Sequence, residues 1–287
     1  MPYSKAVVVL GMHRSGTSAF AYGLQALGVY LGENFLDTKP DNPTGYWEDR
    51  NIVELNERVL GVFGLKWEDV ALIEDAQWRE PKVQALRGEG ASYLEAQFTA
   101  HPLWGFKDPR TVRLLPFWRP VFQHLGVDDT YVVAVRNPLS VASSLLQRQG
   151  MTPVISHMLW LVYLVPYLSE IANRPFVVAD YDFLMNDPKG QLERIGRRLD
   201  IPLHAANPPK IAHFASDFLH PDLRHSLFSK DDFDTIPNVS PLTREAFLWL
   251  HQLATDRIGS DSPRFWSAWE KSQKAVKAMI ASAGLNP

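Results

Sequence analysis

The sequence predicts an α/β fold: a P-loop-like, mostly parallel sheet of about four or five strands with helices on both faces. Three apolar, valine-rich segments, each leading toward a helix start, carry this prediction: Val7–Leu10, Val132–Val135 and Val177–Ala179. Unbroken apolar runs are typical of strands that are buried on both sides in a parallel sheet. The 287 residues suffice for one large domain. Because no linker interrupts them, we expect a single domain over residues 1–287.

A phosphate-binding loop follows the first strand, in the segment Gly11–Ser18. Its two glycines let the backbone close around an anion, and the helix start behind it presents N–H groups and the positive end of a dipole. The candidate ligands in this loop are Gly11, His13, Arg14, Ser15, Gly16, Thr17 and Ser18. Thr17 stands where a P-loop NTPase carries its lysine, so a reaction that depends on that lysine and Mg²⁺ is disfavoured.

A second strand delivers an arginine, Arg136, directly to a helix start. Asn137 is a good N-cap and Pro138 a good first helical residue. Arg136 is therefore expected at the carboxyl end of its strand, where open α/β sheets bind ligands. A solvated strand-end charge is the simpler alternative for this residue taken alone.

The order and spacing of these segments resemble the sulfotransferases that use 3′-phosphoadenosine 5′-phosphosulfate (PAPS), in particular the bacterial and Golgi-type branch. In that family the first loop binds the 5′-phosphosulfate. An arginine at the second strand end and a serine eight positions later bind the 3′-phosphate, and Arg136 and Ser144 reproduce this spacing. The segment Val177–Pro188 looks like the family's Tyr-acidic-x-Leu segment followed by Asp-Pro, which would bring Tyr181 near the nucleotide. The resemblance covers roughly residues 5–200.

The resemblance implies in-line transfer of a sulfuryl group from PAPS to a hydroxyl, or an amine, of a small-molecule or carbohydrate acceptor. Such a transfer needs a base for the acceptor and cations for the leaving group. Arg14 and Lys107 are the candidate cations. In this branch a glutamate after the first helix is the base, which points to Glu48, with Asp49 and Glu54 as competitors. A first-turn acid that stabilises a helix dipole is the simpler alternative.

A second catalytic candidate is the segment Lys107-Asp108-Pro109-Arg110, which ends a further likely strand. Asp108 would cap the next helix and Pro109 would start it. Bacterial sulfotransferases commonly carry such a segment beside the active site, which implies that Lys107, Asp108 and Arg110 lie in this one. Both Glu48 and Asp108 stay open as the base. The histidine base of the cytosolic eukaryotic branch is expected to be absent.

Two other functions stay open: an atypical P-loop small-molecule kinase and a non-catalytic adenine-nucleotide-binding module. The chain has no cysteine and a net charge of −3, so thiolate metal sites are excluded and no basic face for nucleic acid is expected. The nucleotide is expected to need no metal. His213, His220 and His225 lie near several aspartates in the segment 213–233, where the side-chain types suit a divalent ion. Because their spacing is irregular, we favour a lid over the acceptor.

The most apolar stretch, Met158–Leu168, is about eleven residues long, below the roughly twenty needed to span a bilayer. It is expected to be a buried helix. The N-terminal segment has neither the length nor the cleavage site of a signal peptide, so we expect a cytoplasmic protein. The part over residues 201–287 should complete the fold and contribute to an acceptor lid. The acceptor itself and the oligomeric state are not readable from the residues.

Overall fold

The fold is built on a sheet of four parallel strands, in a computed structural model that describes residues 4–38, 44–202, 206–219, 227–236 and 239–284. The strands are β1 (Lys5–Leu10), β2 (Leu103–Lys107), β3 (Asp128–Val135) and β4 (Phe176–Asp180). They lie in the order β2-β1-β3-β4, and every neighbouring pair is parallel. The predicted α/β class is therefore confirmed, with four strands.

Each strand is buried on both faces, which explains the continuous apolar runs. Val8 and Val133 enter the larger of two hydrophobic cores, whereas Val7, Val9 and Val132 enter the smaller one. Successive side chains of a strand point to opposite faces. A sheet covered by helices on both sides therefore needs apolar residues at every position rather than at alternate ones.

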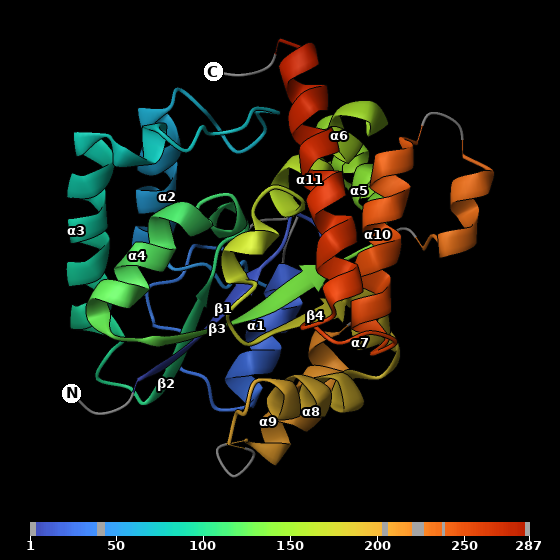
Figure 1. The fold of residues 1–287 in the computed structure, drawn as a ribbon. Coiled ribbons are helices and arrows are strands. Elements are labelled where there is room, and N and C mark those ends of the chain that lie inside the picture. Colours follow the sequence, from blue (N-terminus) through green and yellow to red (C-terminus); the bar gives the residue numbers. More distant parts are fainter. Residues whose placement is uncertain (1–3, 39–43, 203–205, 220–226, 237–238, 285–287) are drawn as a thin grey trace.

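The helices divide between the two faces. The smaller core is covered by α1 (Thr17–Ala26), α7 (Tyr181–Asn186), α8 (Pro188–Arg198), α9 (Pro208–His213) and the turn η5 (Phe214–Phe218). The larger core is covered by α2 (Arg50–Val62), α3 (Pro81–Gln97), α4 (Leu115–Leu125), α5 (Pro138–Gln149), α6 (Pro153–Leu164), α10 (Pro241–Ala254) and α11 (Pro263–Ser282). Short 3₁₀ turns are η1 (Gln77–Arg79), η2 (Pro109–Val112), η3 (Leu168–Ile171) and η7 (Lys230–Asp234). Figure 1 shows α8 and α9 on one side of the strands and α10 and α11 on the other.

Three helices begin at a side chain that caps their first turn. Asn137, Asp187 and Ser262 each accept a hydrogen bond from a backbone N–H two or three residues later, at 3.0 to 3.3 Å. A proline follows each cap as the first helical residue. These ends depend on neighbouring residues only. The cap at Asn137 ends β3 so that Arg136 lies at the carboxyl edge of the sheet.

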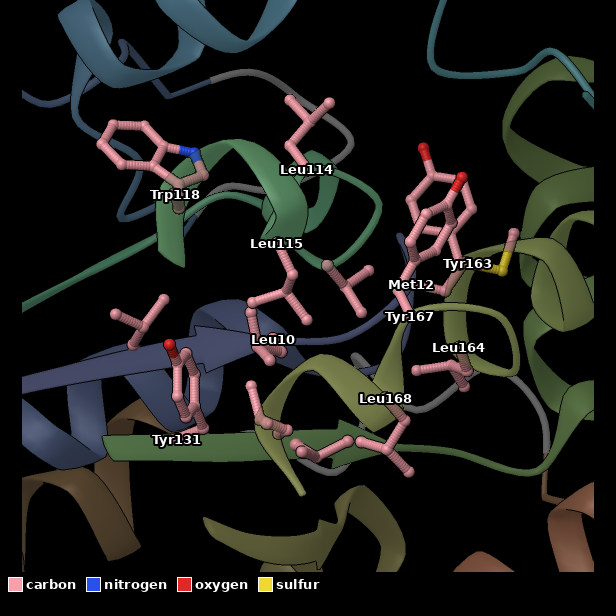
Figure 2. Close-up of a cluster of buried hydrophobic side chains, with 14 of the residues drawn as sticks. Leu10, Met12, Leu114, Leu115, Trp118, Tyr131, Tyr163, Leu164, Tyr167 and Leu168 are labelled. Carbon is pink, nitrogen blue, oxygen red and sulfur yellow. The ribbon is translucent and has the colours of Figure 1, made fainter. Parts of the chain in front are cut away.

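The most apolar segment is longer than the predicted stretch Met158–Leu168. Pro153–Ile171, with 19 residues, is long and apolar enough to cross a membrane by length and composition alone. Of its apolar window, 67% is nevertheless buried inside the protein, and Figure 2 shows Tyr163, Tyr167 and Met12 in one cluster of buried side chains. A helix of the hydrophobic core has the same composition, and the predicted buried helix agrees with this packing.

Candidate active site

The candidate phosphate loop is a tight turn between β1 and α1 that requires its glycines. Gly16 has a φ of 79°, and a Cβ added there would lie 2.1 Å from the ring of Tyr181. Gly11 has a φ of 148°, and a Cβ there would lie 2.5 Å from the carbonyl oxygen of Ala134. Only glycine tolerates both the conformation and the close approach. Gly16 also precedes α1 without a capping side chain, so no side chain of its own covers that end of the helix.

Four of the predicted nucleotide-binding residues meet beside this loop. Arg14 Nε donates a hydrogen bond of 2.8 Å to Ser144 Oγ on α5. Arg136 donates to the carbonyl oxygen of Arg14 at 3.4 Å, and its guanidinium lies 4.9 Å from the ring centre of Tyr181. The carboxyl ends of β1, β3 and β4 therefore bring together groups that the sequence places up to 167 residues apart.

Two polar atoms of the loop are enclosed and have no hydrogen-bond partner among the described residues. They are Ser15 Oγ, on a residue with no exposed surface, and His13 Nε2. Burial, followed by the charges of Arg110 and Lys107, holds the pKa of His13 well below its ordinary value, so the imidazole is neutral. Its ring packs 4.4 Å from the ring of Trp67. Buried polar atoms are usually paired, so two such atoms in one loop mark it as a candidate binding site.

Glu48 lies at the same edge of the sheet, almost completely buried. Lys107 Nζ is 2.6 Å from Glu48 Oε1 and donates to Ser18 Oγ at 3.3 Å. Arg110 approaches the other oxygen, Oε2, to 4.0 Å only, and within the described chain no hydrogen bond reaches that oxygen. Burial, opposed by the charge of Lys107, raises the pKa of Glu48 above its usual range. One oxygen of this carboxylate is therefore open to a substrate.

Asp108, the other candidate base, has both oxygens engaged. Oδ1 accepts hydrogen bonds from the backbone N–H and the Nη1 of Arg110 at 3.0 and 2.8 Å. Oδ2 accepts from Asn56 Nδ2 at 2.8 Å, and Trp118 Nε1 donates to Asn56 Oδ1 at 2.8 Å, which fixes the orientation of that amide. Asp108 caps η2, as the sequence predicts, although a 3₁₀ turn rather than an α-helix follows it.

Asp49 and Glu54, the two acids that compete with Glu48 as candidate bases, lie at other positions on and before α2. Asp49 is the N-cap of α2, where it accepts backbone hydrogen bonds of 3.0 and 3.1 Å and a bond from the hydroxyl of Tyr93. Glu54 lies on the exposed face of α2. Of the acids considered, Glu48 alone combines burial, a cationic neighbour and an oxygen without a hydrogen bond.

Sequence reasoning missed three residues that support the site. Asn56 could have been found from the sequence, because it is a polar residue on the buried stripe of α2. Nothing in the sequence pointed to Arg113. It is fully buried and donates to three carbonyl oxygens of the segment Trp67–Ala71 at 2.8 to 3.4 Å. The hydroxyl of Tyr163 donates to the carbonyl of Trp67 at 2.7 Å. These bonds hold Trp67 against His13.

The expected acceptor lid is described only in part. His220, Asp222 and His225 lie outside the described residues. Within the described ones, His213 and Asp217 form an exposed pair at 2.9 Å, and no group of three His, Asp or Glu side chains could hold a metal ion.

An aromatic cluster joins this region to the site. The ring of Tyr22 on α1 stacks on Phe218 of η5 at 4.2 Å and contacts Trp47 at 4.6 Å. The turn η5 therefore packs beside the residue that precedes Glu48.

No family model and no curated protein matches the sequence. Among solved structures, the sulfotransferase domain from the Synechococcus PCC 7002 olefin synthase is similar, with a TM-score of 0.50 and 16% identity over 90% of this chain and 96% of that domain. Sulfotransferase STF1 from Mycobacterium tuberculosis H37Rv has a TM-score of 0.42 and 14% identity over 83% of this chain and 77% of that one. The first likeness confirms the resemblance at the level of the fold: this chain has the fold of a sulfotransferase domain.

Proposed function

We propose that this protein transfers a sulfuryl group from PAPS to a hydroxyl, or an amine, of a small-molecule or carbohydrate acceptor. The observation that carries the proposal is the direct link between two anion-binding groups: Arg14 of the phosphate loop bonds Ser144, and Arg136 bonds the backbone of Arg14. Two adjacent cationic sites at the carboxyl edge of a parallel sheet suit a nucleotide with phosphates at both ends of its ribose. The fold that this chain shares with a sulfotransferase domain supports the same function.

The residues of the loop fit such an anionic ligand. Ser15 Oγ and His13 Nε2 are enclosed polar atoms without partners among the described residues, and a small movement of the loop on binding would let them donate hydrogen bonds to a sulfuryl or phosphate oxygen. The loop has no lysine at Thr17, and Arg14 of the loop and Arg136 of a neighbouring strand end carry positive charge beside it. These side chains can balance the charge of the ligand without a metal.

PAPS, when bound, would supply the activated sulfuryl group and leave as the 3′,5′-bisphosphate. Glu48 takes the proton of the acceptor through Oε2, the oxygen without a hydrogen bond. Burial raises the pKa of Glu48 and so makes its carboxylate a stronger base than one in water, while the charge of Lys107 opposes this shift. Once Glu48 is protonated, its attraction to Lys107 weakens. Lys107, which also contacts Ser18 of the loop, is then free to stabilise negative charge there.

The deciding experiment measures binding and turnover with a metal chelator present. Calorimetry should give micromolar or tighter binding of 3′-phosphoadenosine 5′-phosphate and much weaker binding of ATP. Incubation with PAPS and a panel of hydroxylated and amine acceptors should add the mass of one sulfuryl group to some of them. Equal affinity for ATP, or a strict need for Mg²⁺, would favour the atypical kinase. Tight bisphosphate binding without hydrolysis or transfer of the sulfuryl group would favour a nucleotide-binding module.

A further inference from the structure

Trp47, the residue before Glu48, has a backbone conformation that bulky residues rarely adopt. Its φ is 56°, in the left-handed region, where the Cβ of an L-residue crowds its own backbone. Among the described residues, the other non-glycine residues with a positive φ are Arg14, Asp200 and Asp256. Aspartate tolerates this region, so the two strained positions, Arg14 and Trp47, both lie in the candidate active site. Such strain persists only where the surrounding structure imposes it.

The half-buried ring of Trp47 is held by neighbours from two parts of the chain. Its centre lies 4.6 Å from the ring of Tyr22 on α1 and 5.3 Å from the ring of Phe35. Its Nε1 donates a hydrogen bond of 3.0 Å to the carbonyl oxygen of Thr44. Aromatic contacts and a paired indole N–H stabilise a tryptophan in one place. They can therefore compensate the unfavourable backbone conformation of this residue.

The backbone is also held on both sides of Trp47. On the N-terminal side, Ser18 Oγ of α1 donates to the carbonyl oxygen of Tyr46 at 3.1 Å. On the C-terminal side, the backbone N–H of Leu36 donates to the carbonyl oxygen of Glu48 at 2.9 Å. Because both flanks are fixed, the backbone angles of Trp47 set the direction in which the chain enters Glu48.

We propose that Trp47 is a positioning residue for Glu48. The contacts of its ring hold the left-handed backbone, and this backbone keeps the Glu48 carboxylate 2.6 Å from Lys107. Trp47 acts in this way without touching the acceptor or the nucleotide. The effect on the reaction rate rests on the proposed function, whereas the placement of the carboxylate can be tested without any reaction.

The first test is a double-mutant cycle of melting temperatures with Trp47→Ala, Glu48→Gln and the double variant. Glu48→Gln leaves the buried Lys107 without its ionic partner, which should lower the melting temperature of the otherwise wild-type protein. If Trp47→Ala has already displaced the carboxylate, the same substitution should cost about half as many degrees or fewer in that background.

Trp266 provides the matched control. It is also half-buried, its Nε1 donates to the carbonyl oxygen of Ser260 at 2.8 Å, and its ring contacts Phe265 at 4.8 Å. It also contacts Phe176, the first residue of β4, and so lies at the opposite edge of the sheet from the candidate site. Trp266→Ala should leave the effect of Glu48→Gln on the melting temperature unchanged, since distant substitutions are additive.

The second test compares rates at a temperature where all variants are folded. Trp47→Ala should lower kcat about 10- to 100-fold, because a small misplacement of a catalytic group is costly, with bisphosphate affinity within about twofold of the wild type. Trp47→Gly loses the same ring but adopts a positive φ without a Cβ clash, so its kcat should be about three- to tenfold above that of Trp47→Ala. Added to Glu48→Gln, Trp47→Ala should lower kcat by less than about threefold.

Additive effects of Trp47→Ala and Glu48→Gln on the melting temperature would overturn the proposal, whatever the activity. A Trp47→Gly variant no more active than Trp47→Ala would overturn it as well, because the backbone conformation would then not matter. Coupled melting temperatures in a protein that transfers no sulfuryl group would support the positioning of Glu48 and contradict the proposed function.

Discussion

The two edges of the sheet each bury a carboxylate among cations, but only one edge satisfies it completely. At the amino edge, Asp129 accepts hydrogen bonds from Arg119 and Tyr131 and pairs with Arg174 at 2.7 Å. At the carboxyl edge, Glu48 has one close partner, Lys107, and an oxygen that no described hydrogen bond reaches. A saturated network stabilises a fold, whereas an unsaturated one marks a candidate site. A buried carboxylate with all its hydrogen bonds made is therefore expected to stabilise the fold, whereas one with an unpaired oxygen is a candidate for catalysis.

The largest expected effect of a substitution at the carboxyl edge is on the rate. Glu48→Gln keeps the size of the side chain and removes its basicity, so kcat should fall by about 10² to 10⁴. The substitution leaves the buried Lys107 without its ionic partner, so the melting temperature should fall, whereas the affinity for 3′-phosphoadenosine 5′-phosphate should stay nearly constant. Steady-state kinetics with an acceptor found in the panel measures the effect.

The matched control is Asp108→Asn, which alters a carboxylate with both oxygens engaged. Loss of its charged bonds to Arg110 should lower the free energy of unfolding by about 1 to 3 kcal/mol and reduce kcat less than Glu48→Gln does. If Glu48→Gln turns over within about fivefold of the wild type, while Asp108→Asn with intact binding does not, the base is Asp108.

A substitution at the amino edge should lower the stability of the protein and leave its reaction rate unchanged. Asp129→Asn removes the charge that pairs with Arg119 and Arg174, and the broken network should lower the free energy of unfolding by about 3 kcal/mol. Urea denaturation measures this loss. Under conditions where the variant is folded, kcat and bisphosphate affinity should remain within about twofold of the wild type. A lower kcat in a protein of native stability would contradict the distinction between the two edges.

Substitutions in the part of the carboxyl edge that we propose to bind the nucleotide should lower the affinity for it rather than the rate. Arg136→Ala should cost about 2 to 4 kcal/mol of bisphosphate binding, because it removes a charged phosphate contact. Ser144→Ala should cost about 1 kcal/mol. Adenosine 5′-phosphosulfate lacks the 3′-phosphate, so both variants should bind it almost as the wild type does. Equal losses for both nucleotides would show that this pair does not hold the 3′-phosphate.

A separate effect, on stability alone, is expected from the pH dependence of Asp180, the N-cap of α7. Burial, and then the charge of Asp182, raise the pKa of Asp180 to about 7 from an ordinary value of 3.8. A raised pKa in the folded state adds stability that is present below pH 4 and lost as the pH rises to about 7. Asn caps a helix as well as Asp does, so Asp180→Asn should be more stable than the wild type by about 1 to 2 kcal/mol at pH 8.

Denaturation of both proteins at pH 4 and pH 8 tests this linkage. The advantage of the Asn variant should be confined to the higher pH, because only there does the wild type keep a charged, buried Asp180. An advantage of the same size at both values would mean that the charge of Asp180 is not the cause.

Local elements could be predicted from the sequence because their causes lie within a few residues of one another. Gly16 must be glycine for the turn that it makes, Asn137 caps the helix that Pro138 begins, and valine runs occupy a sheet buried on both faces. The meeting of Arg136 with the phosphate loop followed as well, since parallel strands end at one edge.

Only the tertiary structure decided which charges are satisfied. Glu48 and Lys107 are 59 positions apart, and Asn56 reaches Asp108 across 52, so no local pattern predicts either bond. The pairing of Lys107 with Glu48 and the buried clamp made by Arg113 both depend on where distant segments pack. By itself the sequence determined the strands, the loop and the helix ends, because backbone conformation is governed by near neighbours. Side-chain pairing and burial follow from contacts between segments far apart in the chain, and these exist only in the folded protein.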